Sequence, residues 1–252
     1  MRGQILHIAL AAIFIKPILA LPPEVALQME SEAAYLDPWP VGTCTDGSQG
    51  LTAEVYQQGV TGTETCIPTY AFNPGSSSGD IELRDNDCNA LARIEEDAFR
   101  DYQGKIIIKC NLKMLTHVGI RAFTQEKNSA SIVDLSSALR LETIGQQAFY
   151  GFEGKILMSE GLMFDTTGIS ERYDELKSIG DSAFEYVGTQ SSNLGGISIV
   201  GADKLMSIGV NAFRNYKGSV RIIGEFPMLT FIGGNAFQYA NAGYAYGKIE
   251  IT

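Results

Sequence analysis

One pattern recurs six times along the chain and constrains its fold more than any other feature. Each copy reads Leu, two residues, Ile or Val, three residues, then Ala-Phe. The copies begin at Leu91, Leu115, Leu141, Leu176, Leu205 and Leu229. A weaker copy precedes them at Ile67 and Ala71-Phe72. A period of about 28 residues indicates stacked coils, because so short a unit buries its apolar residues only against its neighbours.

A second apolar segment follows most of the Ala-Phe pairs, as in Ile106-Ile-Ile108, Ile156-Leu-Met158 and Ile249-Glu-Ile251. Apolar residues recur there with a period of two, which predicts one short strand per coil. The strands of successive coils should pair in parallel. The sequence therefore predicts a β-rich α/β solenoid of about seven coils, with turns and short helices between the strands.

The repeat also resembles a known family. The string Ile179-Gly-Asp-Ser-Ala-Phe184, with Leu176 three residues upstream, is similar to the BspA-type (Treponema-type) leucine-rich repeat. The resemblance covers residues 64–252 and implies a leucine-rich-repeat solenoid. It also implies a secreted or surface-displayed protein that acts in binding and adhesion. The family offers no shared catalytic centre to carry over.

The first 20 residues are typical of a secretory signal peptide. Arg2 precedes an apolar run that ends at Ala20, before Leu-Pro-Pro. A membrane helix is the weaker interpretation, because Lys16 and Pro17 interrupt the run. The mature chain is therefore predicted to be secreted or on the cell surface, without a transmembrane segment. Residues 21–63 carry no repeat and are predicted to form an arm and a cysteine cap before the repeats of 64–252.

The fourth repeat is predicted to carry two loop insertions, at residues 159–175 and 188–195, both rich in Gly, Ser and Thr. The chain ends at Ile251-Thr252, within a predicted strand and without a polar capping repeat. An exposed strand edge readily pairs with another chain. Two interpretations stay open: the sequence is a fragment, or the open edge serves self-association.

The charge of the chain excludes some classes of partner. Removal of residues 1–20 takes away Arg2 and Lys16, which leaves 17 basic and 29 acidic residues, a formal charge of −12. Nucleic acids and anionic membrane surfaces would be repelled.

Four cysteines, Cys44, Cys66, Cys88 and Cys110, follow one another at intervals of 22 residues. An even number in a secreted chain suggests two disulfides, and three pairings are possible. We favour Cys44 with Cys66 and Cys88 with Cys110, because the last two follow strands of adjacent coils. A metal site is the alternative, although no Cys-x-x-Cys spacing supports it.

No catalytic, cofactor or metal site is predicted. His117 occupies a variable repeat position and should face solvent, and no nucleophile motif accompanies it. A calcium loop from Asp85 to Glu96 has suitable oxygen ligands, but Ala90 stands where such a loop requires glycine. An aromatic residue two or three places after the Ala-Phe pair recurs as a possible ladder along one edge. Its members are Tyr102, Phe152, Tyr186, Tyr216 and Tyr239. Core or rim packing is its favoured role, and sugar binding the alternative.

The outward residues of the strands form the candidate binding surface. Strand parity assigns to it Glu82, Lys105, Ile107, Asp134, Leu157, Ser198, Arg221 and Glu250. Their mixed chemistry suits contact with an extracellular protein or matrix ligand. The favoured hypothesis is thus an adhesion module, and the alternative is a structural component of an extracellular layer or filament assembled through the solenoid ends.

Overall fold

The computed structural model describes residues 65–72, 79–158, 172–188, 196–240 and 249–251. All of them lie within one compact unit, residues 40–252. The predicted signal peptide, the predicted arm and Cys44 fall outside the described residues, as do 159–171 and 189–195 of the two predicted insertions. No helix in the described part is long and apolar enough to cross a membrane.

Each coil contributes two strands, one more than the period-two pattern predicts. The first is a strand of two residues that ends at the Ile or Val of the repeat, or at its equivalent. These strands form the parallel, seven-stranded sheet A in chain order: β1 (Cys66–Ile67), β3 (Arg93–Ile94), β5 (His117–Val118), β7 (Thr143–Ile144), β9 (Ser178–Ile179), β11 (Ser207–Ile208) and β13 (Phe231–Ile232). Two residues are too few for an alternation to be recognised in the sequence.

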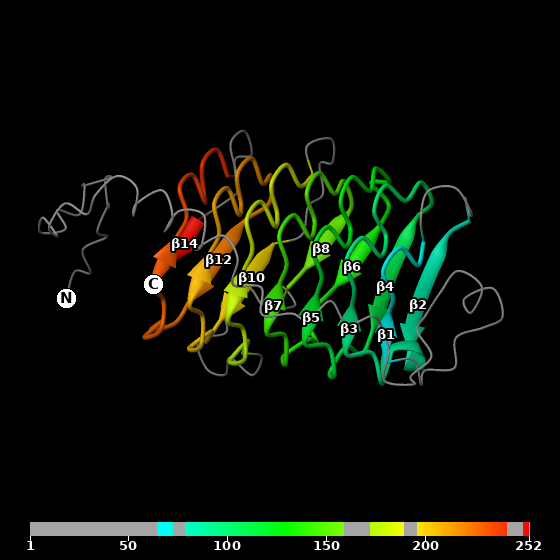
Figure 1. Cartoon of the computed structure of the whole chain (residues 1–252), viewed down its shortest axis with the longest axis horizontal. Helices are drawn as coiled ribbons and strands as arrows, with labels where there is room; N and C mark the ends of the chain where they lie inside the picture. The colour runs from blue at the N-terminus through cyan, green and yellow to red at the C-terminus, as the bar shows by residue number, and fades with distance from the viewer. Residues whose placement is uncertain (1–64, 73–78, 159–171, 189–195, 241–248, 252) are drawn as a thin grey trace, which may run out of the picture. The chain divides into compact units, whose positions relative to one another are not determined.

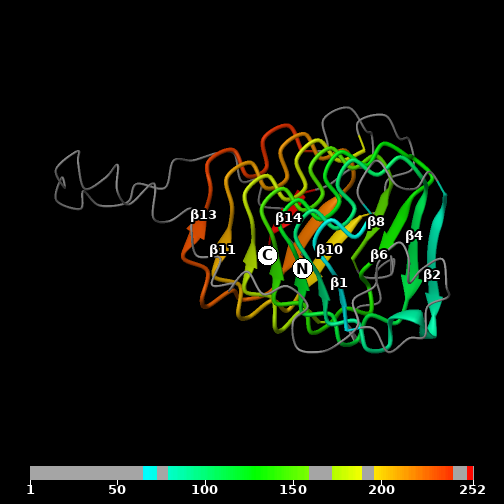
Figure 2. The same ribbon diagram turned by 45° about the vertical axis from the view of Figure 1, so that its right-hand side comes forward.

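The second strand of each coil is the one that the sequence predicts. Four of these strands form sheet B: β2 (Ile81–Asp85), β4 (Ile106–Cys110), β6 (Ile132–Asp134) and β8 (Lys155–Leu157). Three more form sheet C: β10 (Ile197–Val200), β12 (Val220–Ile223) and β14 (Ile249–Ile251). All pairs are parallel, and one bridge, Met158 to Ile197, links the two sheets. Figures 1 and 2 show the strands stacked coil upon coil.

A single apolar core runs between these walls, as the repeat predicts. It contains the Leu, Ile or Val, Ala and Phe of the repeat together with the inward residues of sheets B and C. The repeat phenylalanines stack face to face from coil to coil, with ring centroids 4.7 to 5.3 Å apart. The solenoid is therefore confirmed.

Left-handed turns replace most of the predicted short helices. The described part contains one helix, the 3-10 helix η1 (Asn86–Cys88). The residue before each Ala-Phe pair has φ between 53° and 59°: Tyr70, Asp97, Arg121, Gln147, Ser182, Asn211 and Asn235. This backbone turns its amide toward the next coil, and the Arg121 amide, for example, donates to the Gln146 carbonyl at 2.9 Å. The turn thus gives each coil hydrogen bonds along the stack.

Candidate interaction surface

Strand alternation places the predicted binding residues on the outward side of sheets B and C. Ile106 and Ile108 are fully buried, whereas Ile107 between them is half-buried. The same holds for the outward residues of the other described strands: Glu82, Asp134, Leu157, Ser198 and Arg221. Lys105 directly precedes β4, and Glu250 lies in β14 in register with Arg221.

The strand register divides these residues into two groups. On sheet B, Glu82 pairs with Ile107, and Asp134 pairs with Leu157. On sheet C, Ser198 pairs with Arg221. The eight predicted residues therefore do not form one continuous row, because Ile107 is in register with Ile132, two residues before Asp134.

The register also reveals an apolar group that the sequence analysis only partly identified. Ile107 pairs with Ile132 on the neighbouring strand, and Leu157 lies on the strand after that. We call Ile107, Ile132 and Leu157, on β4, β6 and β8, the sheet-face patch. All three are half-buried and outward. Ile132 is not among the residues predicted to face outward, because the alternation of apolar residues in the sequence begins at its inward neighbour, Val133.

Charged residues of both signs border the sheet-face patch, and Glu82 and Asp134 lie in register with Ile107 and Leu157. Lys109 and Lys155 lie on the same outward side and form no ion pair with another described residue. Lys105, by contrast, is paired with Asp80 at 2.7 Å. A hydrogen bond between these two side chains raises the pKa of Lys105 and lowers the pKa of Asp80. The patch thus combines an apolar centre with a charged rim of two lysines, Glu82 and Asp134.

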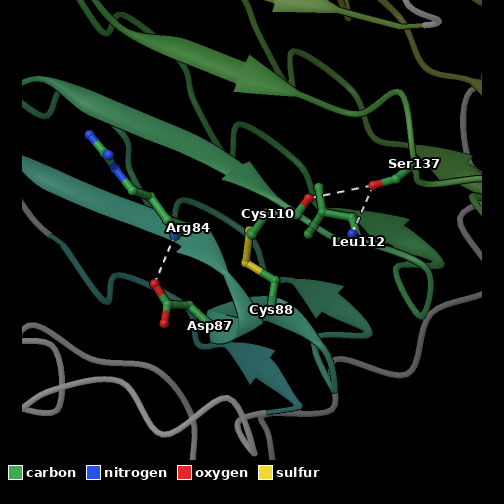
Figure 3. Close-up of a disulfide and its surroundings, with 6 residues drawn as sticks. All are labelled: Arg84, Asp87, Cys88, Cys110, Leu112 and Ser137. Carbon is green, nitrogen blue, oxygen red and sulfur yellow. Dashed lines mark hydrogen bonds between the residues drawn. A yellow bond between two sulfur atoms is a disulfide. The ribbon is translucent and has the colours of Figure 1, made fainter.

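A disulfide fastens the edge of sheet B. It joins Cys88, at the end of η1, to Cys110, at the end of β4, with a Cα–Cα distance of 5.7 Å (Figure 3). Beside it, the Ser137 hydroxyl accepts a hydrogen bond from the Leu112 amide at 2.9 Å and donates one to the Cys110 carbonyl. This pairing is the one favoured from the sequence. Cys66 is also disulfide-bonded, and its favoured partner Cys44 lies outside the described residues.

The predicted aromatic ladder does not form along one edge. Tyr102, Phe152 and Tyr216 lie three residues after the Phe and are buried, with edge-on contacts to the stacked phenylalanines. Tyr186 and Tyr239 lie two residues after the Phe, in the left-handed region, and Tyr239 is 60% exposed. Side chains two residues after the Phe and three residues after it therefore point in different directions. Tyr102, Phe152 and Tyr216 pack in the core and offer no surface for a sugar.

The prediction that His117 faces solvent is wrong. His117 lies in β5 between Arg93 and Thr143 of the adjacent strands, and only 8% of its surface is exposed. Burial, together with the positive charges of Arg93 and Lys177, lowers its pKa to about 3. The ring is therefore neutral at physiological pH. The side chains of the two adjacent strands cover the ring, and its Nδ1 lies 2.6 Å from the Thr116 hydroxyl oxygen.

Sequence reasoning also missed a buried carboxyl group. Glu126 stands three residues after Phe123, where other coils have Tyr102 or Phe152, and it is completely buried. Its Oε1 accepts hydrogen bonds from the Asn128 amide (2.8 Å) and the Ser131 hydroxyl (2.9 Å). Burial raises the pKa of Glu126 to about 7, despite these hydrogen bonds.

We expect Glu126 to make the stability depend on pH. Between its ordinary pKa of 4.5 and about 7, the folded chain holds a proton that the unfolded chain has lost. The stability that it contributes is complete below pH 4.5 and falls by about 1.4 kcal/mol per unit as the pH rises toward 7. The lowered pKa of His117 acts in the opposite sense, since the unfolded chain binds the proton there below pH 6.5.

The variant Glu126→Gln isolates the contribution of the carboxyl group, because glutamine keeps the acceptor oxygen and does not titrate. Urea unfolding from pH 4.5 to 7.5 should show the variant gaining about 3 kcal/mol over the wild type across this range. Glu225→Gln, at an exposed glutamate, is the control. A difference between Glu126→Gln and the wild type that is independent of pH would contradict the prediction.

Comparison with known proteins agrees with the geometry. The profile of the BspA-type leucine-rich repeat region matches six copies over residues 60–158 and 169–244, more than half of the chain. Repeats of this type generally mediate contacts between proteins, have no enzymatic activity and typically occur on secreted or surface proteins. No curated protein and no solved structure gave a match. The repeat pattern, the stacked fold and the family match agree, and the chain belongs to the BspA-type leucine-rich repeat family.

Proposed function

We propose that this chain is a secreted or surface-displayed adhesion protein that binds an extracellular protein or a matrix component. The sheet-face patch is the contact surface. The observation that carries the proposal is the set of three apolar side chains, Ile107, Ile132 and Leu157, on the outward side of consecutive strands. An outward sheet face that only met water would be expected to carry polar side chains there.

The charge around the patch supports a protein partner. Protein interfaces combine an apolar centre with a polar rim, and Lys109 and Lys155 supply such a rim. A complementary partner would bring apolar side chains to the centre and carboxylates to the two lysines. Ser198 and Arg221, in register with each other on sheet C, extend the proposed surface toward the later coils.

We assign the protein no catalytic activity and no cofactor. In the described repeats, the single histidine is buried and neutral, so it is not available to a substrate as a base. The proposal therefore rests on surface complementarity alone.

Removal of the patch should weaken adhesion without unfolding the chain. We expect the double variant Ile107→Ser, Leu157→Ser to bind a surface coated with basement-membrane extract at least about tenfold more weakly than the wild type. The side chains are half-buried, so the fold should persist, and circular dichroism would verify this.

The control is Met114→Ser with Met206→Ser, which removes two apolar side chains that are exposed away from the patch. It should bind as the wild type does. Equal binding by the patch variant and the wild type, or no binding by the wild type, would refute the proposal.

A further inference from the structure

The outward residues of sheet B lie in two rows that cross its four strands, β2, β4, β6 and β8 (Figure 1). The first row is in register from strand to strand: Glu82, Ile107, Ile132 and Lys155. The second row lies two residues further along each strand: Arg84, Lys109, Asp134 and Leu157. A ligand that lies on the sheet-face patch along the stack therefore meets one residue of each row per coil.

The phenylalanine stack gives the distance from one coil to the next. In the four coils that carry these strands, the ring centroids of Phe72, Phe99, Phe123 and Phe149 follow one another at 4.7, 4.9 and 4.9 Å. The same spacing is typical of paired strands. The first row thus spans about 15 Å from Glu82 to Lys155.

This spacing matches an α-helix better than an extended segment. Residues i, i+3, i+7 and i+10 lie on one face of a helix and span about 15 Å, because each residue advances the helix by about 1.5 Å. An extended segment presents every second residue to one side, so four such residues span about 20 Å. Its fourth side chain would miss its place in the row by about 5 Å, which is one whole coil.

The charges of the first row favour one class of helix. Its two apolar side chains lie between a carboxylate, that of Glu82, and a cation, that of Lys155. Glu82 forms an ion pair with Arg84 of the second row, whereas Lys155 forms none with another described residue. Lys155 is therefore the charge of the first row that best suits a partner's carboxylate.

A carboxylate opposite Lys155 also defines the direction of the helix. Acidic side chains stabilise a helix in its first turn, and basic side chains stabilise it in its last turn. The helix would thus begin over β8, where Lys155 lies, and end over β2, where a basic side chain would face Glu82.

The second row adds to the contact. The two rows are about 7 Å apart, and a helix with its side chains is about 10 to 12 Å wide. A helix centred on the first row therefore also covers Leu157, which is half-buried, and reaches Lys109, which is exposed.

We propose that the sheet-face patch binds an amphipathic α-helix of the partner, with the helix axis along the stack and its N-terminus over β8. This inference rests on the proposed function, because it specifies what the same patch contacts. The helix presents a carboxylate to Lys155, apolar side chains to Ile132 and Ile107, and a cation to Glu82. These four positions, i, i+3, i+7 and i+10, form one face of the helix.

Fluorescence anisotropy with a designed peptide tests the proposal on the full mature chain. The probe is a stapled helix of about 14 residues, since shorter unstapled helices are marginal in water. It carries Glu, Leu, Leu and Lys at i, i+3, i+7 and i+10 on a background of Ala and Gln. We expect saturable binding with a Kd below about 100 µM. A peptide of the same composition, with the four residues at alternate positions, should bind at least about tenfold more weakly.

Two variants of equal charge locate the contact. Lys155→Glu should weaken binding of the helical probe at least about threefold, because it places a carboxylate opposite the glutamate of the probe. Lys113→Glu, at an exposed lysine outside both rows, should bind the probe as the wild type does. Circular dichroism would verify that both variants are folded.

Failure of the wild type to bind the helical probe would overturn the proposal, as would equal or tighter binding of the alternate-position peptide. Equal losses in Lys155→Glu and Lys113→Glu would also overturn it, because net charge alone would then explain the effect. A wild type that adheres to basement-membrane extract through the patch but does not bind the probe would refute the helix and leave the adhesion proposal intact. The two failures can therefore be told apart.

Discussion

Gly145→Ala should lower the free energy of unfolding by about 3 kcal/mol or more, because it inserts a methyl group between two coils. A Cβ at this position would lie 2.7 Å from the Gly119 carbonyl carbon and from the Ile120 amide nitrogen. Both atoms belong to the backbone of the preceding coil and cannot rotate away. The coils would have to separate, and the hydrogen bond from the Gly145 amide to the Val118 carbonyl, 2.8 Å long, would weaken.

The same clash is expected wherever glycine follows the aliphatic residue of the repeat, at Gly119, Gly180, Gly209 and Gly233. The matched control is Gly234→Ala, since its Cβ would meet nothing within 4 Å. Its φ lies outside the left-handed region, so its stability should change by less than about 0.5 kcal/mol. Urea denaturation followed by circular dichroism measures both variants. Similar losses in the two variants would show that the spacing of the coils is not the cause.

Phe149→Ala should cost about 4 kcal/mol, because it removes a fully buried ring from the middle of the phenylalanine stack. Its ring lies 4.9 Å from that of Phe123 and 5.3 Å from that of Phe184, and Phe152 packs edge-on against it at 5.8 Å. The cavity would therefore interrupt contacts within one coil and between three coils. The stability of a solenoid depends on contacts between neighbouring coils. Loss of the Phe149 ring should therefore weaken the contact between the early and the late coils.

Phe237→Ala makes the same chemical change at the end of the stack and serves as the control. Phe237 is only partly buried and stacks on one ring, that of Phe213, at 5.3 Å. The expected loss is about 1 to 2 kcal/mol. Equal losses for the two variants would contradict the view that the stacked rings stabilise the fold through both of their neighbours.

The stacked coils shift the pKa values of two buried carboxyl groups in opposite directions. Asp97 is fully buried and has a left-handed backbone. Burial alone would raise its pKa, but two hydrogen bonds from the Arg121 guanidinium, both 2.8 Å long, hold the pKa below its ordinary value. Arg121 belongs to the next coil, so the pair links the first two full repeats. Glu126 has no such cation, which explains why its pKa moves in the opposite direction.

The family and the core could be predicted from the sequence, while the interaction surfaces could be predicted only in part. The spacing of Leu, Ile, Ala and Phe identifies the inward residues directly, because it repeats in every coil. Ile107 and Leu157 were correctly placed outward by parity, but Ile132 was not recognised as their neighbour. Parity states which side of a strand a residue occupies, and it does not state which residue of the next strand lies beside it.

The repeat by itself determined the stacked solenoid and the buried column of phenylalanines, since these follow from a pattern that is local and periodic. Only the tertiary structure decided the strand register, the burial of His117 and Glu126, and the close approach of the coils at Gly145. Those properties depend on which residues of the adjacent coils lie against a given position. A periodic sequence specifies what each coil contains, and the stacking of coils decides which of its residues water can reach.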